Sequence, residues 1–102
     1  MTGKQPAPSA TGISRTANVY ATFSEAVRAS TVSQATVRLR DSVTGSIITA
    51  VVSYDSTRKR ASVDPSITLT ARRTYIVLVS SGIRDRAGNR LFASSWSFKT
   101  GS

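Results

Sequence analysis

The side chains of this sequence that could bind a ligand are most concentrated in the stretch GIRDRAGNRL, residues 82–91. Asp85 and Asn89 carry the carboxylate and amide oxygens that calcium prefers, although calcium takes about 6 to 8 oxygens. The same two side chains can accept backbone N–H groups inside a turn, and Gly88 can adopt a positive φ without penalty. We therefore interpret Asp85, Gly88 and Asn89 as a structural turn between Ile83 and Leu91, with a weak calcium site near Asp85 and a partner contact as alternatives.

The sequence is strongly basic, because it has three lysines and eleven arginines but only five acidic residues, which gives a net charge of +9. Such a balance predicts attraction to anionic polymers, or only a soluble basic surface. The candidate contacts form two clusters, Arg58, Lys59 and Arg60 in one and Arg84, Arg86 and Arg90 in the other. We expect the two clusters at opposite ends of the domain. Aromatic residues do not alternate with these arginines as a single-stranded nucleic-acid site requires, so a nucleic-acid partner is not favoured.

Catalysis is not expected, because the sequence has neither histidine nor cysteine. Imidazole bases, thiolate nucleophiles, disulfides and the commonest zinc ligands are therefore excluded. A serine–lysine pair would need a buried lysine, and Lys4, Lys59 and Lys99 fall in a linker, a hairpin and an outward strand position. The five acids are too scattered to suggest a glycosidase pair. We predict a protein that is not an enzyme and uses no cofactor or metal.

The length of 102 residues predicts one domain with one core. Residues 1–12 are rich in Pro, Gly, Ser and Thr without apolar periodicity, so we interpret them as a flexible linker and residues 13–101 as the domain. No apolar run reaches the roughly 20 residues of a membrane-spanning helix, and no signal-peptide core is present. We expect an internal piece of a longer secreted or surface protein.

Apolar residues recur at every second position in several short segments, which is the period of strands in a sheet. Val37 and Leu39, for example, should point inward and Arg38 and Arg40 outward. In 46–55 both faces are similarly apolar, and we predict that the set with Tyr54 is inside. A helical turn starting near Ser30 should interrupt the pattern. The seven expected strands cover residues 13–15, 18–24, 35–41, 46–55, 58–65, 73–81 and 94–100, which favours an all-β antiparallel sandwich of two sheets.

Three segments carry a family resemblance in their order and spacing: VYATFSEAVRASTVS, VSYDSTRKRASVDPSITLTARRTYIVLVSSGIRDRAGNRL and WSFKTG. Together they resemble the bacterial Ig-like domain of S-layer and surface proteins over residues 13–101. At the start, PAPSATGIS replaces the proline-bearing entry strand of that pattern. The resemblance implies an Ig-like Greek-key β-sandwich within a multidomain secreted or surface protein.

Aromatic residues fit the same fold on physical grounds. Leu69 precedes Tyr75 by six residues, and a tyrosine at the start of a strand after such a crossing can bond its hydroxyl to the backbone upstream, forming a tyrosine corner. Phe23, Trp96 and Phe98 are interpreted as core aromatics rather than a carbohydrate-stacking platform.

We therefore expect a non-catalytic spacer or scaffold between neighbouring domains of the parent chain. The alternative is an adhesion module that binds a cell-wall polyanion or glycan through its surface arginines.

Overall fold

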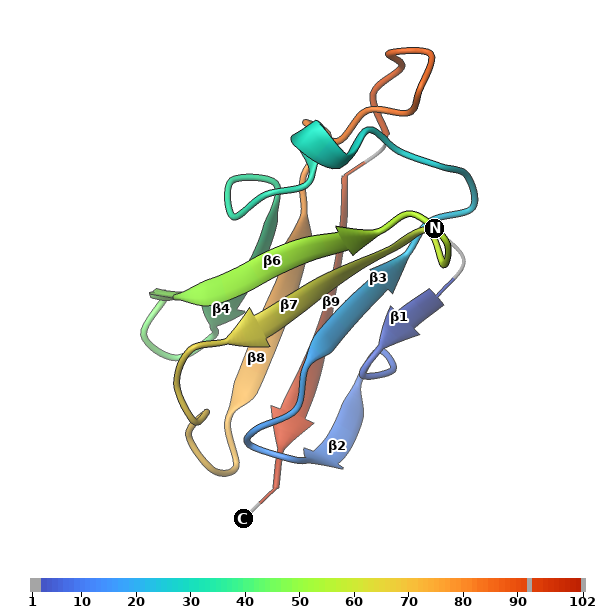
Figure 1. Cartoon of the computed structure of the whole chain (residues 1–102). Helices are drawn as coiled ribbons and strands as arrows, with labels where there is room; N and C mark the ends of the chain where they lie inside the picture. The colour runs from blue at the N-terminus through green and yellow to red at the C-terminus, as the bar shows by residue number, and fades with distance from the viewer. Residues whose placement is uncertain (1–2, 92, 102) are drawn as a thin grey trace.

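The computed structural model describes residues 3–91 and 93–101. Its fold consists of two β-sheets packed face to face (Figure 1). One sheet has the strand order β1-β3-β7-β6 and the other β2-β9-β8-β4-β5, which confirms the all-β sandwich. No helix in these residues is long and apolar enough to cross a membrane. The elements in chain order are β1 (Gly3–Gln5), β2 (Ala10–Ile13), β3 (Val19–Thr22), η1 (Ala29–Thr31), β4 (Val37–Asp41), β5 (Ile47–Ile48), β6 (Ala50–Asp55), β7 (Arg60–Pro65), β8 (Thr74–Val79) and β9 (Ser94–Thr100).

The core lies between the sheets and follows the predicted alternation. Val37 pairs with Val79 and Leu39 with Val77 across β4 and β8, and all four side chains are buried, whereas Arg38 between them is exposed. Alternate side chains of a strand point to opposite faces, so one buried face leaves the other to solvent.

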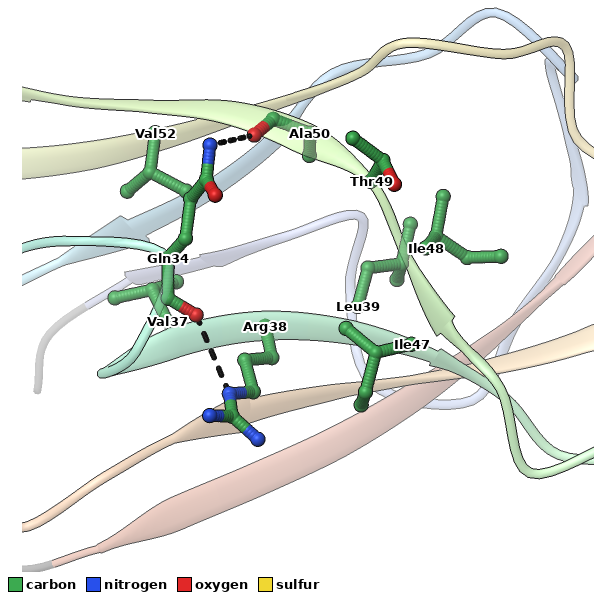
Figure 2. A pocket seen from close by; sticks show the side chains of 9 residues that line it. All are labelled: Gln34, Val37, Arg38, Leu39, Ile47, Ile48, Thr49, Ala50 and Val52. Atoms are coloured by element: carbon green, nitrogen blue, oxygen red, sulfur yellow. Dashed lines mark hydrogen bonds between the residues drawn. The ribbon is translucent and has the colours of Figure 1, made fainter.

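The segment 46–55, expected as one strand, is divided between the two sheets. Ile47–Ile48 pairs with β4, and Ala50–Asp55 pairs with β7, with Thr49 between them. The prediction of an inward set containing Tyr54 is confirmed, because Ala50 is buried while Val51 is 61% exposed. Gln34, in the loop before β4, reaches β6 of the other sheet, since its side-chain amide donates to the Ala50 carbonyl at 2.8 Å (Figure 2).

Residues 3–12, which were expected to be part of a linker, belong to the sandwich, and this expectation is corrected; residues 1 and 2 lie outside the described part. β1 pairs antiparallel with β3, and β2 pairs parallel with β9. Trp96 donates from its indole Nε1 to the buried Pro6 carbonyl at 2.9 Å. Backbone pairing and this one bond hold the segment, so its side chains show no apolar period that the sequence could reveal.

The turn between β3 and β4 is a short 3-10 helix rather than one capped by Ser30. It spans Ala29–Thr31 with Arg28 at the N-cap, and no side chain bonds at that cap. Instead the Thr31 hydroxyl donates to the Arg28 carbonyl at 2.6 Å. The Arg28 backbone N–H donates to the Arg84 carbonyl at 2.8 Å, which ties this turn to the loop between β8 and β9.

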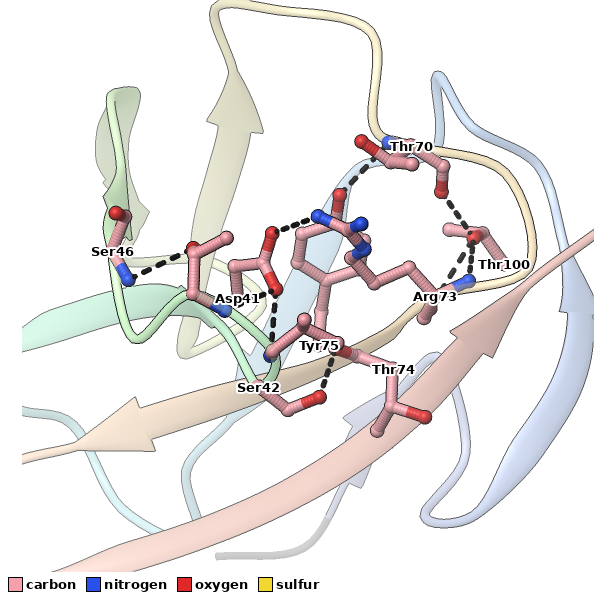
Figure 3. A network of polar contacts seen from close by, with 10 residues as sticks. Asp41, Ser42, Ser46, Thr70, Arg73, Thr74, Tyr75 and Thr100 are labelled. Carbon is pink, nitrogen blue, oxygen red and sulfur yellow. Dashed lines mark hydrogen bonds and ion pairs between the residues drawn. The ribbon is translucent and has the colours of Figure 1, made fainter.

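Tyr75, at the start of β8, is 1% exposed and closes the crossing from β7 (Figure 3). Its hydroxyl accepts the backbone N–H of Thr70 at 2.8 Å. The preceding Leu69 is fully buried. Thr100, on β9, donates its hydroxyl to the Thr70 carbonyl at 2.6 Å. The connection from β7 to β8 is therefore hydrogen-bonded to β8, which begins beside it, and to β9, which ends beside it.

An ion pair that the sequence did not suggest lies beside this corner. Arg73 contacts the Asp41 carboxylate at 2.8 Å, and the Asp41 side chain is only 7% exposed (Figure 3). Burial raises the pKa of Asp41, but hydrogen bonds from Arg73 and from the backbone N–H groups of Val43 and Thr44 outweigh burial and hold it below the ordinary carboxyl value.

The body is elongated, with extents of 43 × 21 × 20 Å. Gly3 pairs with Thr22 at the end of β3, and Gly101 follows β9. β9 ends near one extremity of the body, whereas β1 begins part-way along it, well short of the loop between β8 and β9 at the other extremity (Figure 1).

Candidate functional site

The loop between β8 and β9 is closed by a reciprocal set of bonds between Asp85 and Asn89. The Asp85 N–H donates to the Asn89 carbonyl at 2.9 Å, and the Asn89 N–H returns a bond to the Asp85 carboxylate at 2.9 Å. The Asn89 amide reaches the second carboxylate oxygen at 3.3 Å. Gly88 has a φ of +91°, in the region that favours glycine. Both Asp85 oxygens are therefore engaged within the loop.

The electrostatics of Asp85 follow from these contacts. The backbone N–H of Asn89 is the main cause that holds the pKa of Asp85 below its ordinary value, with further help from the Asn89 amide. Among the described residues, no group of three or more acidic, histidine or cysteine side chains could hold a metal ion.

The base of this loop is anchored in the core. Ile83 is fully buried, and Leu91 packs against the core with its N–H donating to the Ile83 carbonyl at 2.9 Å. Arg84 and Arg90 lie opposite each other in an isolated bridge. The anchored base positions the arginines above it.

Four arginines meet around this loop, one of which the sequence did not single out. The guanidinium of Arg84 donates to the Gly88 carbonyl at 3.0 Å, and that of Arg28 donates to the Arg86 carbonyl at 3.2 Å. Arg86 and Arg90 are exposed. Arg28 and Arg86 are 58 residues apart in the chain, so no local sequence pattern could have indicated that Arg28 belongs to this loop.

The second basic cluster occupies the hairpin between β6 and β7. Asp55 accepts the backbone N–H groups of Thr57 and Arg58, and its carboxylate lies 3.3 Å from the Arg58 guanidinium. The backbone N–H of Arg58 is the main cause that lowers the pKa of Asp55. Lys59 sits at the tip with a φ of 55°, and the Arg60 guanidinium stacks over the Tyr20 ring at 4.3 Å.

The two clusters lie at the same end of the sandwich, so the expectation of opposite ends is wrong (Figure 1). The Phe23 N–H donates to the Lys59 carbonyl at 2.7 Å, and the Val27 N–H donates to the Tyr54 hydroxyl at 3.2 Å. Val27 in turn bridges to Asp85. The physical reason is strand direction: β3 and β6 both run antiparallel to β7, so the chain leaves both of them at the end where β8 also finishes.

A hollow of about 540 Å³ opens beside these loops. Its lining includes the apolar Phe23 and Leu91 and charges of both signs, with Lys4 and Arg90 opposed by Glu25 and Asp85. The arginine-bearing end is therefore electrostatically mixed rather than uniformly basic.

The predicted core aromatics are all buried. Phe98 lies 6.1 Å from Tyr75 in a stacked arrangement, and Phe23 lies 6.3 Å from Tyr54 in a tilted one, between ring centroids. Trp96 is 6% exposed, with the Lys4 ammonium 5.8 Å from its ring. This arrangement leaves none of the three predicted aromatics as an exposed platform.

Sequence comparison places this sandwich in a family. The profile of the bacterial Ig-like domain matches residues 1–100. The chain belongs to this family. That match includes residues 3–12, which agrees with the two strands found there. No curated protein matched the bacterial Ig-like domain described here.

Solved structures share the fold of this Ig-like domain at low sequence identity. A crystal structure of the S-layer protein rSbsC(31-844) is 23% identical over 91% of this chain, with a TM-score of 0.70. The N-terminal part of the bacterial S-layer protein SbsC gives 23% identity and a TM-score of 0.71. CopC from Methylosinus trichosporium OB3b gives 14% identity over 98% of this chain and 90% of CopC, with a TM-score of 0.76. The chain spans 13% and 22% of the two SbsC chains.

Proposed function

We propose that this Ig-like domain is a non-catalytic spacer or scaffold between other domains of a secreted or cell-surface bacterial protein. The observation that carries the proposal is that both terminal segments are paired into the sheets, β1 and β2 at the start of the described chain and β9 at its end. Domains joined through these segments are connected directly to the packed sheets. A stiff body of packed sheets sets both the distance and the orientation of its neighbours.

Strand pairing supports a load-bearing form of this role. β2 and β9 lie side by side in parallel, with Ile13 paired to Thr100. The Ser9 N–H donates to the Ser97 carbonyl at 2.7 Å, and the Gly101 N–H donates to the Ile13 carbonyl at 2.9 Å. Tension applied through the two ends pulls β2 and β9 in opposite directions along their length. Their hydrogen bonds, which lie across the strands, are then loaded together rather than one after another.

Single-molecule stretching tests this role, and the absence of cysteine allows handles at chosen positions. One variant carries cysteines added beyond both ends of the chain, and the other carries Ser14→Cys with a cysteine beyond the C-terminus. Ser14 follows β2 at the end where β9 finishes, so this second geometry separates β2 from β9 bond by bond. We expect a higher unfolding force between the ends. Equal forces in the two geometries would contradict a load-bearing spacer.

The adhesion role is a second candidate, favoured by the meeting of both basic clusters at one end. Arg58, Arg86 and Arg90 are all exposed there. Retention of the domain on an anionic polymer, measured over a series of salt concentrations, tests this candidate because the salt dependence reports the charges engaged. A domain that no anionic polymer retains at physiological salt would remove the adhesion candidate and leave the spacer.

A further inference from the structure

The outer face of the five-stranded sheet is a second basic surface, distinct from the loop end. Arg38 and Arg40 on β4 and Lys99 on β9 are exposed, and their neighbours along each strand are buried. We call these three residues and the strand surface between them the basic sheet face. Ile76 and Leu78 of β8, which lies between β4 and β9, are half-buried.

The basic sheet face carries positive charge without acidic neighbours. Asp41 is the one acid in the strands of this sheet, and it is buried and paired with Arg73. The other four acids lie in the loops or in the opposite sheet: Glu25, Asp55, Asp64 and Asp85. The loop end, by contrast, holds the Arg58–Asp55 pair and the carboxylates of Glu25 and Asp85. An anionic partner therefore meets less repulsion on the sheet face than at the loops.

Arg38 stands between two hollows on this side of the molecule. One, of about 510 Å³, runs along the ends of β4, β8 and β9 and is lined partly by Thr36, Ser80 and Ser95. The other, of about 320 Å³, opens toward β5 and β6 (Figure 2). The Arg38 Nε donates to the Gln34 carbonyl at 3.2 Å. Among the described residues this is its one bond, so its terminal nitrogens remain available.

The three cations of the basic sheet face are spaced for a polymer rather than for one small anion. Residues two apart on a strand are separated by about 7 Å, and strands by about 4.8 Å. Arg40 pairs with Ile76, and Ile76 pairs with Ser97, two residues before Lys99. From this register Arg38 and Lys99 lie roughly 17 Å apart on a diagonal across the sheet.

We propose that the basic sheet face binds a linear acidic polysaccharide through Arg38, Arg40 and Lys99. The proposal rests on the adhesion candidate and assigns it to the sheet instead of the loops. Small hydroxyl side chains, Ser95 and Ser97 on β9, lie across β8 from Arg38 and Arg40 and can bond to sugar hydroxyls. The outward side chains of β4, β8 and β9 include no aromatic residue on which a nucleic-acid base could stack, so a polysaccharide is favoured over single-stranded nucleic acid.

The test compares two triple variants of the whole chain that lose the same charge. R38Q/R40Q/K99Q changes the sheet face, and R58Q/R86Q/R90Q changes the loop end; each lowers the net charge from +9 to +6. Binding to polygalacturonate is measured from about 0.05 to about 0.5 M salt, and neutral dextran is the control polymer.

The sheet-face variant should lose about 100-fold in affinity at roughly 0.1 M salt. The slope of log K against log salt should fall by about 2, because three cations are removed and each contact to a charge on a single-stranded polyanion contributes about 0.7. The loop-end variant should lose less than about threefold, as expected for distant, screened charges. All six positions in the two variants are exposed, and equal unfolding midpoints in urea establish that both variants are folded. The charge-preserving variant R38K/R40K should retain most of the binding, which provides a second test at the same positions.

The other outcomes separate this proposal from the candidate on which it rests. Equal losses in the two variants would overturn the sheet face, because net charge alone would then explain retention. A loss confined to the loop-end variant would overturn it while supporting adhesion through the loops. If the unmodified chain does not bind polygalacturonate, both the sheet face and acidic-polysaccharide adhesion fail, and the spacer role is untouched. Binding to poly(dT) without binding to polygalacturonate would assign the surface to nucleic acid and reject the proposal.

Discussion

Replacing Tyr75 by phenylalanine removes one buried hydroxyl and leaves the ring in place. The hydroxyl accepts the Thr70 N–H at 2.8 Å in a part-buried hydrogen bond, and Tyr75 itself is 1% exposed. The ring keeps its stacked contact with Phe98 at 6.1 Å. Losing this part-buried hydrogen bond costs about 0.5–1.5 kcal/mol, and we expect a loss near the upper limit, about 1.5 kcal/mol, in the free energy of unfolding.

Urea denaturation is the assay for Tyr75→Phe. The midpoint should fall by about 1 M with an unchanged m-value, and Tm should fall by roughly 6–12 °C. Tyr20→Phe is the matched control, because Tyr20 is half-buried and its hydroxyl has no bond to a described residue; it should change the midpoint little. Equal midpoints for the two variants, or a loss below about 0.5 kcal/mol for Tyr75→Phe, would refute the assigned role of the hydroxyl.

Three further predictions concern single residues. The pKa of Asp41 is lowered in the folded state, so the unfolded state binds its proton first and stability falls as pH drops below the ordinary carboxyl value of about 3.9; Asp41→Asn should weaken that acid dependence in urea titrations at several pH values. Gly88→Ala should lower the free energy of unfolding by about 1–2 kcal/mol, because alanine is strained at a φ of +91°. The added Cβ would lie at an ordinary 3.7 Å from Arg28, so no clash contributes, and a neutral result in urea denaturation would contradict the positive φ. Trp96→Phe leaves the Pro6 carbonyl unpaired and should cost about 1–3 kcal/mol; hydrogen exchange should then speed up in Gly3–Gln5, and unchanged exchange there would argue against this bond as the anchor of β1.

Strand periodicity was a sufficient guide to most of the sheet. The alternation of Val37 and Leu39 with arginines, and of Trp96 and Phe98 with polar residues, predicted which side chains are buried. This succeeds because a strand with one face in the core must place every second residue there, whatever its partner strands are. The same period failed for residues 3–12, which are held by backbone pairing and by the bond from Trp96 to Pro6.

The candidate sites depended on tertiary structure more than the buried faces of the strands did. The turn from Asp85 to Asn89 is local, so turn chemistry was enough to predict a closed loop. Arg28 could not be added to that loop from the sequence, because it reaches Arg86 across 58 residues. The two basic clusters were expected at opposite ends, whereas the contact from Phe23 to Lys59 brings both to one end.

By itself, the sequence determined the all-β class, the inward faces of the main strands and the absence of histidine and cysteine chemistry, because these follow from composition and from a period of two along one strand. Only the tertiary structure decided which strands are neighbours, and hence where charges gather. Arg38, Arg40 and Lys99 share a face because β8 lies between β4 and β9 in the sheet, an order that no local pattern contains. Strand order is set by the packing of the whole chain, and so is the electrostatic character of each surface.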